Sequence, residues 1–101
     1  MGSRQQEYLL PRGGHAHKEC LEVIIAASGS FTVNLDDGTR KEAFRLSRPD
    51  EGLLVNTGIW RTLEDFSADS VCFVLASDLY DAEDYIYEYE DFLEYTKNGQ
   101  S

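Results

Sequence analysis

The chain has 101 residues and a formal net charge of −10, with 42% hydrophobic and 12% aromatic residues. This length and composition predict one small globular domain over residues 1–101, and the net negative charge disfavours nucleic acid as a partner, because phosphate binding draws on clustered cations. No apolar run approaches the ~20 residues of a membrane span and no basic leader precedes one, so we expect a cytoplasmic protein that does not bind membranes.

The N-terminal half of the chain reads as short strands. Residues 1–11 give at most one edge strand, whereas residues 20–27, CLEVIIAA, are apolar and β-branched and end at Ser28-Gly29, which is typical of a strand and a turn. In residues 30–46, SFTVNLDDGTRKEAFRL, Phe31, Val33 and Leu35 alternate with polar residues before Asp37-Gly38, and the apolar residues 43, 44 and 46 follow it. This pattern predicts a β-hairpin.

Three more strands are expected before residue 78. They come from GLLVNTG at 52–58, WRTLEDF at 60–66 and DSVCFVLAS at 69–77, and the nearly continuous apolar run of the last predicts a strand buried on both faces. The barrel strands would then lie within residues 12–77. Cys20 and Cys72 sit in apolar runs without CxxC spacing, so we expect buried free thiols.

The pattern changes at Asp81. The segment DAEDYIYEYEDFLEYTKNG has acids at its start, Lys97 near its end and Gly99 beyond, which predicts a helix over residues 81–97. Its tyrosines are expected to pack on the sheet or on a partner subunit. Short antiparallel strands followed by one C-terminal α-helix favour an all-β fold, a small barrel or jelly roll.

The segment RGGHAHKEC at 12–20 carries the most distinctive chemistry. His15 and His17 share one face of a strand, because side chains two residues apart point the same way. With Glu22 they match the His, His and Glu spacing of the first metal-binding motif of cupin barrels, which makes a metal-dependent cupin one hypothesis. A metal cupin would be expected to add a later histidine, but the chain has two in total, and Arg61 places a cation in the region concerned.

The second reading of the pair is metal-free proton transfer. A neutral imidazole with a pKa near 6.5 can remove a proton made acidic by an adjacent carbonyl, and His15 and His17 with Arg61 would suit that task. Arg12 precedes two glycines and is a candidate fork for phosphate or carboxylate. Lys18 points away from the histidines on the alternating pattern, so we expect a surface or subunit role for it.

Six segments, in a consistent order, resemble one known family. They are RGGHAHK at 12–18, SGSF at 28–31, LDDG at 35–38, GLLVNTGIW at 52–60, DFSADSVCFVLASDLYDAEDYI at 65–86 and YEDF at 89–92. Together they resemble the nucleotide-sugar 3,4-ketoisomerases, the WxcM-like cupins. The combination of RG-HAHK with VLAS-x-x-YD-x-x-DY makes the resemblance specific.

The resemblance implies a homodimeric cupin-type jelly-roll barrel that binds a dTDP-linked keto sugar. It would move the carbonyl of a dTDP-4-keto-6-deoxyhexose from C4 to C3, on the way to deoxyamino sugars of bacterial surface polysaccharides. It also implies that no metal or other cofactor is used, that His15 and His17 are the acid/base pair, and that Arg12, Arg61 and Tyr8 contact the substrate. Arg61 lies where family members vary, which links it to the face on which C4 is reprotonated. A cupin that binds a nucleotide sugar without turning it over is an alternative.

The chain departs from the family pattern at three places. Residues 1–14 precede His15 where family members carry a longer segment, so that Tyr8 is the one tyrosine available there. Glu22 stands where glutamine is common, which keeps the metal hypothesis open. Tyr87 replaces an arginine that is common at its position.

Overall fold

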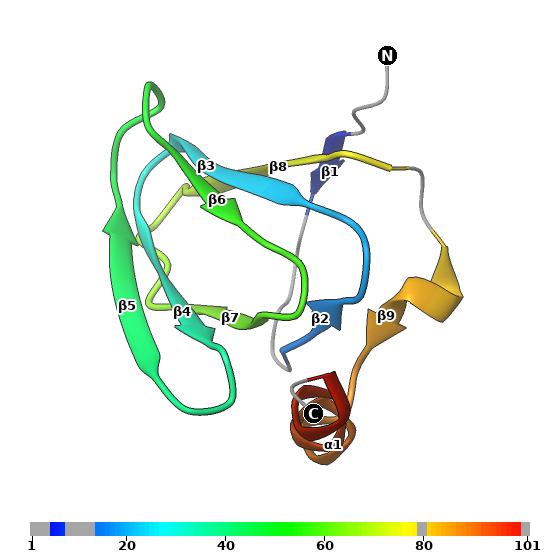
Figure 1. Cartoon of the computed structure of the whole chain (residues 1–101). Coiled ribbons are helices and arrows are strands. Elements are labelled where there is room, and N and C mark those ends of the chain that lie inside the picture. The colour runs from blue at the N-terminus through cyan, green and yellow to red at the C-terminus, as the bar shows by residue number, and fades with distance from the viewer. Residues whose placement is uncertain (1–4, 8–13, 79–80, 100–101) are drawn as a thin grey trace.

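A computed structural model describes residues 5–7, 14–78 and 81–99 (Figure 1). Nine strands, one 3₁₀ turn and one helix follow one another in this part of the chain. Their bounds are β1 Gln5–Glu7, β2 Ala16–His17, β3 Glu22–Ser28, β4 Phe31–Asp36, β5 Lys41–Leu46, β6 Gly52–Val55, β7 Trp60–Glu64, β8 Val71–Ala76, η1 Ala82–Asp84, β9 Tyr85–Ile86 and α1 Tyr89–Gly99.

The strands form two sheets and a short strand pair, all antiparallel. One sheet has the order β1-β8-β3-β6 and the other the order β5-β4-β7, while β2 pairs with β9. A backbone bridge between His15 and Arg61 joins β2 to the edge of β7. Figure 1 shows the two sheets facing each other, with α1 outside them beside β2 and β9. The expected all-β jelly roll with one C-terminal helix is confirmed.

The core lies between the sheets because successive side chains of a strand point to opposite faces. Ile24 and Ala26 of β3 meet Phe31 and Val33 of β4 and Val74 of β8, and each of these five residues is almost completely buried. Burial of this apolar surface is the main force that holds the sheets together. A second apolar cluster docks α1, through the packing of Phe92 on Ala16, Trp60 and Ile86.

The predicted hairpin forms between β4 and β5. The strands pair from Phe31 opposite Leu46 to Asp36 opposite Lys41, and Gly38 takes the positive φ of 101° that favours glycine in a tight turn. The carboxylate of Asp37 accepts the backbone N–H of Arg40 at 2.7 Å, which closes the turn.

The helix begins at Tyr89, so the predicted start at Asp81 is wrong. Asp81 caps a single 3₁₀ turn, and the backbone of Tyr85–Ile86 then pairs with Ala16–His17 as strand β9. The two segments are far apart in the sequence. Because they pair as strands, the backbone groups of residues 85–86 are not available for the hydrogen bonds of a helix. Among the described residues, no helix is long and apolar enough to cross a membrane.

The strand from residues 69–77 is also less buried than predicted. In β8, Val74 faces the core, but Val71 and Leu75 are exposed on the other side. They belong to an outer surface of the β8, β3 and β6 strands that we call the apolar sheet face, formed by Val23, Ile25, Leu54, Val71, Phe73 and Leu75. Cys20 and Cys72 are buried and free, as predicted.

Candidate active site

Strand β2 and the bridge residue before it, His15, direct both imidazoles into the barrel. His15 exchanges two backbone hydrogen bonds with Arg61, at 3.1 and 2.9 Å, which fixes β2 against β7. Ala16 points the opposite way, into the cluster that docks α1. Gly14 precedes the pair because a Cβ at this position would lie 2.5 Å from the indole Nε1 of Trp60. The predicted shared face of His15 and His17 therefore exists, and their ring centroids are 5.0 Å apart.

Glu22 lies between the two histidines and the arginine. Its Oε2 is 3.0 Å from Nε2 of His17, and its Oε1 accepts a hydrogen bond of 2.7 Å from the guanidinium of Arg61. His15 Nε2 lies 4.0 Å from the same Oε1. Three of these groups are almost fully enclosed, since the relative exposure is 1% for His17, 2% for Glu22 and 1% for Arg61. A buried carboxylate thus links all three predicted groups.

The site keeps its groups in defined charge states. Burial, reinforced by the positive charge of Arg61, lowers the pKa of His15 from 6.5 to about 4, so this imidazole is neutral at neutral pH. Burial alone would raise the pKa of Glu22, but the hydrogen bond with His17 and the charge of Arg61 outweigh it and lower that pKa. The result is a neutral base beside a charged carboxylate.

Asp84 and Tyr85 also belong to the site, although the sequence interpretation gave them no role. Asp84 Oδ2 is 3.0 Å from Nδ1 of His17, on the opposite side of the ring from Glu22. The ring of Tyr85 contacts both imidazoles, with centroids 4.2 Å from His17 and 5.6 Å from His15. Both residues fall in the segment predicted to be helical, where neither would have met β2. The sequence feature that could have pointed to them is the DY pair, Asp84-Tyr85, which ends the motif VLAS-x-x-YD-x-x-DY.

The geometry supports the metal hypothesis only in part. One ligand atom each from His15, His17 and Glu22 lie within 4.8 Å of one another. Both oxygens of Glu22 are engaged, however, and the cation of Arg61 is bonded to one of them. A divalent ion there would have to compete with a buried guanidinium for the carboxylate, so the donor set fits a metal poorly.

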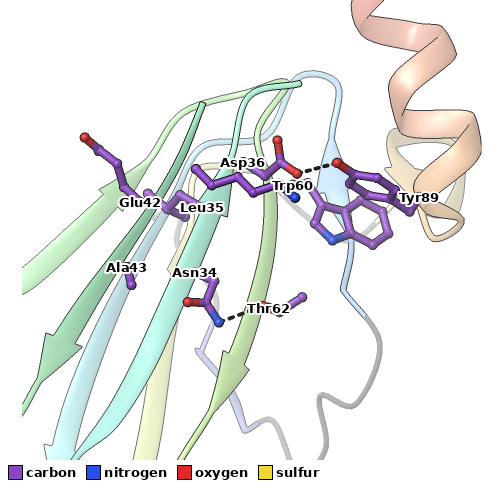
Figure 2. A pocket seen from close by; sticks show the side chains of 9 residues that line it. Asn34, Leu35, Asp36, Glu42, Ala43, Trp60, Thr62 and Tyr89 are labelled. Atoms are coloured by element: carbon purple, nitrogen blue, oxygen red, sulfur yellow. Dashed lines mark hydrogen bonds between the residues drawn. The ribbon is translucent and has the colours of Figure 1, made fainter. Parts of the chain in front are cut away.

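A separate pocket lies on the outer side of the β5-β4-β7 sheet (Figure 2). It has a volume of about 440 Å³ and is bordered by Trp60, Asp36 and Tyr89, with Asn34 and Thr62 on the strands beside it. Trp60 and Arg61 are neighbours on β7 and so project to opposite faces. The pocket is therefore on the other side of the strand from the histidines.

Two predicted substrate contacts, Arg12 and Tyr8, lie outside the described residues. Lys18 is exposed and does not join the histidines, as the alternating pattern predicted. The structure thus brings together His15, His17 and Arg61 of the predicted set, with Glu22 among them.

Comparison with known proteins places the chain in a family. The family described as FdtA: WxcM-like, C-terminal, matches residues 5–97. The chain belongs to this WxcM-like family.

Several relatives of this WxcM-like chain have known activities or structures. A TDP-4-oxo-6-deoxy-alpha-D-glucose-3,4-oxoisomerase from Aneurinibacillus thermoaerophilus is 46% identical over 85 residues, which are 84% of this chain and 61% of that protein. The chain thus spans about three fifths of the length of this curated relative. The X-ray structure of WlaRB, a TDP-quinovose 3,4-ketoisomerase from Campylobacter jejuni, is 41% identical, with a TM-score of 0.81 over 91% of this chain and 73% of that one.

A third relative has been crystallised with ligands. QdtA, a sugar 3,4-ketoisomerase from Thermoanaerobacterium thermosaccharolyticum, was solved in complex with TDP and is 30% identical, with a TM-score of 0.86 over 95% of this chain and 72% of that one. A histidine-to-asparagine mutant of QdtA was solved in complex with TDP-4-keto-6-deoxyglucose.

Proposed function

We propose that this protein is a metal-free 3,4-ketoisomerase that moves the keto group of a dTDP-4-keto-6-deoxyhexose from C4 to C3. The observation that carries the proposal is the pair of imidazoles, one buried and one 15% exposed, around one buried carboxylate, inside a barrel whose relatives are TDP-sugar ketoisomerases. The product class fits the formation of deoxyamino sugars for bacterial surface polysaccharides.

The reaction needs two proton transfers at neighbouring carbons. The C3 proton is acidic because C4 is a ketone, and its removal by an imidazole gives an enediol once the C4 oxygen takes up a proton. The proton of the C3 hydroxyl then leaves, and C4 gains a proton as the C3 ketone forms. No proton is lost overall, so a pair of imidazoles can shuttle them.

The site supplies the groups for this exchange. His15 is neutral and is 15% exposed, so we assign it to accept or return a proton at the sugar. His17 is more deeply buried and exchanges its proton beside Glu22. Arg61 holds Glu22 as a carboxylate and places positive charge near the enediolate oxygen.

The nucleotide part of the substrate calls for further contacts. Arg12 and Tyr8 are proposed to hold the diphosphate and the sugar, in line with the family resemblance. A guanidinium binds phosphate with two parallel hydrogen bonds, which suits Arg12.

The proposal is tested by incubating the protein with TDP-4-keto-6-deoxyglucose in deuterated buffer and following the sugar by proton NMR. We expect the C3 proton signal to vanish and a 3-keto product to accumulate, with deuterium at C4. A sample treated with chelator beforehand should react at the same rate. A protein that binds the nucleotide sugar but forms no 3-keto product and incorporates no deuterium would be the non-catalytic binding cupin, and a rate abolished by chelator would favour the metal-dependent one.

We also propose that the protein forms a homodimer through the apolar sheet face. Leu54 is 55% exposed, and it lies beside Val23 and, across β3, Leu75. A run of apolar side chains over three adjacent strands is unusual for an outer surface that stays in water. A second copy of the chain can cover such a face with the same residues, because a two-fold interface is self-complementary.

Charged substitutions on this face test the dimer. Leu54→Lys should convert a dimer to a monomer in analytical ultracentrifugation, because the lysines would be buried in the contact. Ala43→Lys, on the exposed outer side of β5, is the matched control and should leave the dimer intact. A wild-type protein that sediments as a monomer at high concentration would refute the proposal.

A further inference from the structure

Asp84 lies in a motif of the family resemblance, but the resemblance implied no role for it, and the structure holds its carboxylate against His17. We propose that Asp84 is a positioning residue: it keeps a proton on Nδ1 of His17, so that Nε2 is the nitrogen through which His17 exchanges protons in the reaction. The inference rests on the proposed ketoisomerase function for its catalytic consequence, but the contact itself can be tested without turnover.

The contact is fixed from both sides. Asp84 ends the 3₁₀ turn η1, and its neighbour Tyr85 pairs with His17 in the β9–β2 ladder. The carbonyl oxygen of Asp84 also accepts the backbone N–H of Lys18 at 2.9 Å. The backbone pairing of the two segments therefore places Asp84 beside His17. The contact does not depend on the side-chain rotamer of Asp84 alone.

The carboxylate is also fixed by backbone donors. Its Oδ1 accepts the N–H of Glu19 at 2.6 Å, and its Oδ2 accepts the N–H of Cys20 at 3.3 Å, in addition to the contact of 3.0 Å with Nδ1 of His17. Partial burial would raise the pKa of Asp84, but these backbone N–H groups and His17 outweigh it and lower that pKa. A carboxylate that accepts from three sides is a fixed acceptor.

The two nitrogens of His17 face different partners. Nδ1 faces Asp84, while Nε2 faces Glu22, with His15 beyond it. A protonated ring can donate to both carboxylates, but a neutral ring has one N–H and can donate to only one of them. Glu22 shares its charge with Arg61, whereas the other polar contacts of Asp84 are neutral backbone donors. The proton of the neutral ring therefore stays on Nδ1, and Nε2 is the nitrogen that loses and regains a proton.

Nitrogen NMR of the imidazole rings tests the contact directly. In wild type, the neutral ring of His17 should carry its proton on Nδ1, facing Asp84. The chain has two histidines, so the spectrum of His15→Gln assigns the signals. In Asp84→Asn, whose amide is nearly isosteric but can also donate to Nδ1, we expect the neutral ring to shift towards the tautomer protonated on Nε2.

The catalytic consequence is tested by kinetics. Asp84→Asn should lower kcat by at least about tenfold with KM within about threefold, because the ring is still present but carries its proton on the wrong nitrogen. Asp81→Asn is the matched control, since Asp81 caps the same turn through the N–H of Glu83 and does not touch His17. It should leave kcat and the His17 signals unchanged.

Two results would overturn the inference. One is a neutral His17 in wild type that carries its proton on Nε2, which can be seen even if Asp84→Asn fails to fold. The other is an Asp84→Asn protein whose His17 signals and kcat both match wild type within about twofold. If wild type shows no turnover but its His17 signals respond to Asp84→Asn as expected, the positioning contact holds and the proposed ketoisomerase activity fails.

Discussion

The barrel interior has two chemically different regions built from the same strands. Towards β2 and β9 it holds His17, Glu22 and Arg61, all buried and all polar. Glu22 lies on β3 and Arg61 on β7, and two residues further along these two strands Ile24 and Leu63 belong to a core that is wholly apolar. Strands β3 and β7 thus supply both regions, and two residues along a strand separate a charged site from a hydrophobic core.

The comparison shows how the protein accommodates buried charge. The apolar region is stabilised by packing, and any residue there acts mainly through its volume. The polar region is stabilised only while its members are paired, because Glu22 without Arg61 would be a charge in a medium that solvates it poorly. The two regions should therefore respond differently to substitution and to pH.

The largest effect is expected where the pairing is broken. Arg61→Met keeps most of the volume but leaves Glu22 without its cation, so we expect a loss of about 3 to 5 kcal/mol in the free energy of unfolding, measured by urea denaturation at pH 7. The double variant Glu22→Gln with Arg61→Met should recover most of that loss. A single variant that loses less than about 1 kcal/mol would show that the pairing contributes little to stability.

The next effect is a pH dependence confined to the polar region. The pKa of His15 is about 4 in the folded protein and 6.5 as the ordinary value, so the unfolded chain takes up this proton first as the pH falls. Stability from this residue is complete above about pH 6.5 and is lost between pH 6.5 and about pH 4, by about 1 to 3 kcal/mol for a site slightly open to water.

His15→Gln tests this dependence in the same denaturation assay. The variant should lack the part of the slope that lies between about pH 6.5 and about pH 4. The lowered pKa values of Glu22 and Asp84 produce a separate loss at more acidic pH, which His15→Gln should leave largely in place. Equal slopes in wild type and variant over the upper window would count against a buried neutral His15.

The smallest effect is expected in the apolar region. Ile24→Val removes one methylene group from the centre of the core and should cost about 0.5 to 1.5 kcal/mol. Because no titratable group is involved, the cost should be the same at pH 5 and pH 8. A cost that changes with pH would mean that the two regions are coupled through β3.

The sequence predicted the parts of this molecule that depend on local pattern. Strand alternation and the Asp37-Gly38 turn located the hairpin, and the i to i+2 spacing put His15 and His17 on one face. The run of short strands predicted a small barrel or jelly roll, and the family resemblance added the cupin type. These features follow from neighbours in the chain, or from motifs long enough to be specific.

What the sequence did not predict depends on contacts between distant segments. The periodicity of residues 81–97 favoured a helix, but pairing with β2 turned Tyr85–Ile86 into a strand and brought Asp84 to His17. Glu22 was recognised as a candidate metal ligand, whereas its bond to Arg61 spans 39 positions. Alternation could not tell that the outer side of β8 would be exposed, because both of its sides are apolar.

The central claim is that the histidine pair transfers the protons, and His17→Asn tests it most directly. Wild type and variant would be incubated with TDP-4-keto-6-deoxyglucose in deuterated buffer, with binding of the nucleotide sugar measured in parallel. We predict that the variant binds within about threefold of wild type but loses the C3 proton and gains deuterium at C4 at least about 100-fold more slowly, as expected for loss of an acid/base group. Equal rates of deuterium incorporation in the two proteins would contradict the account.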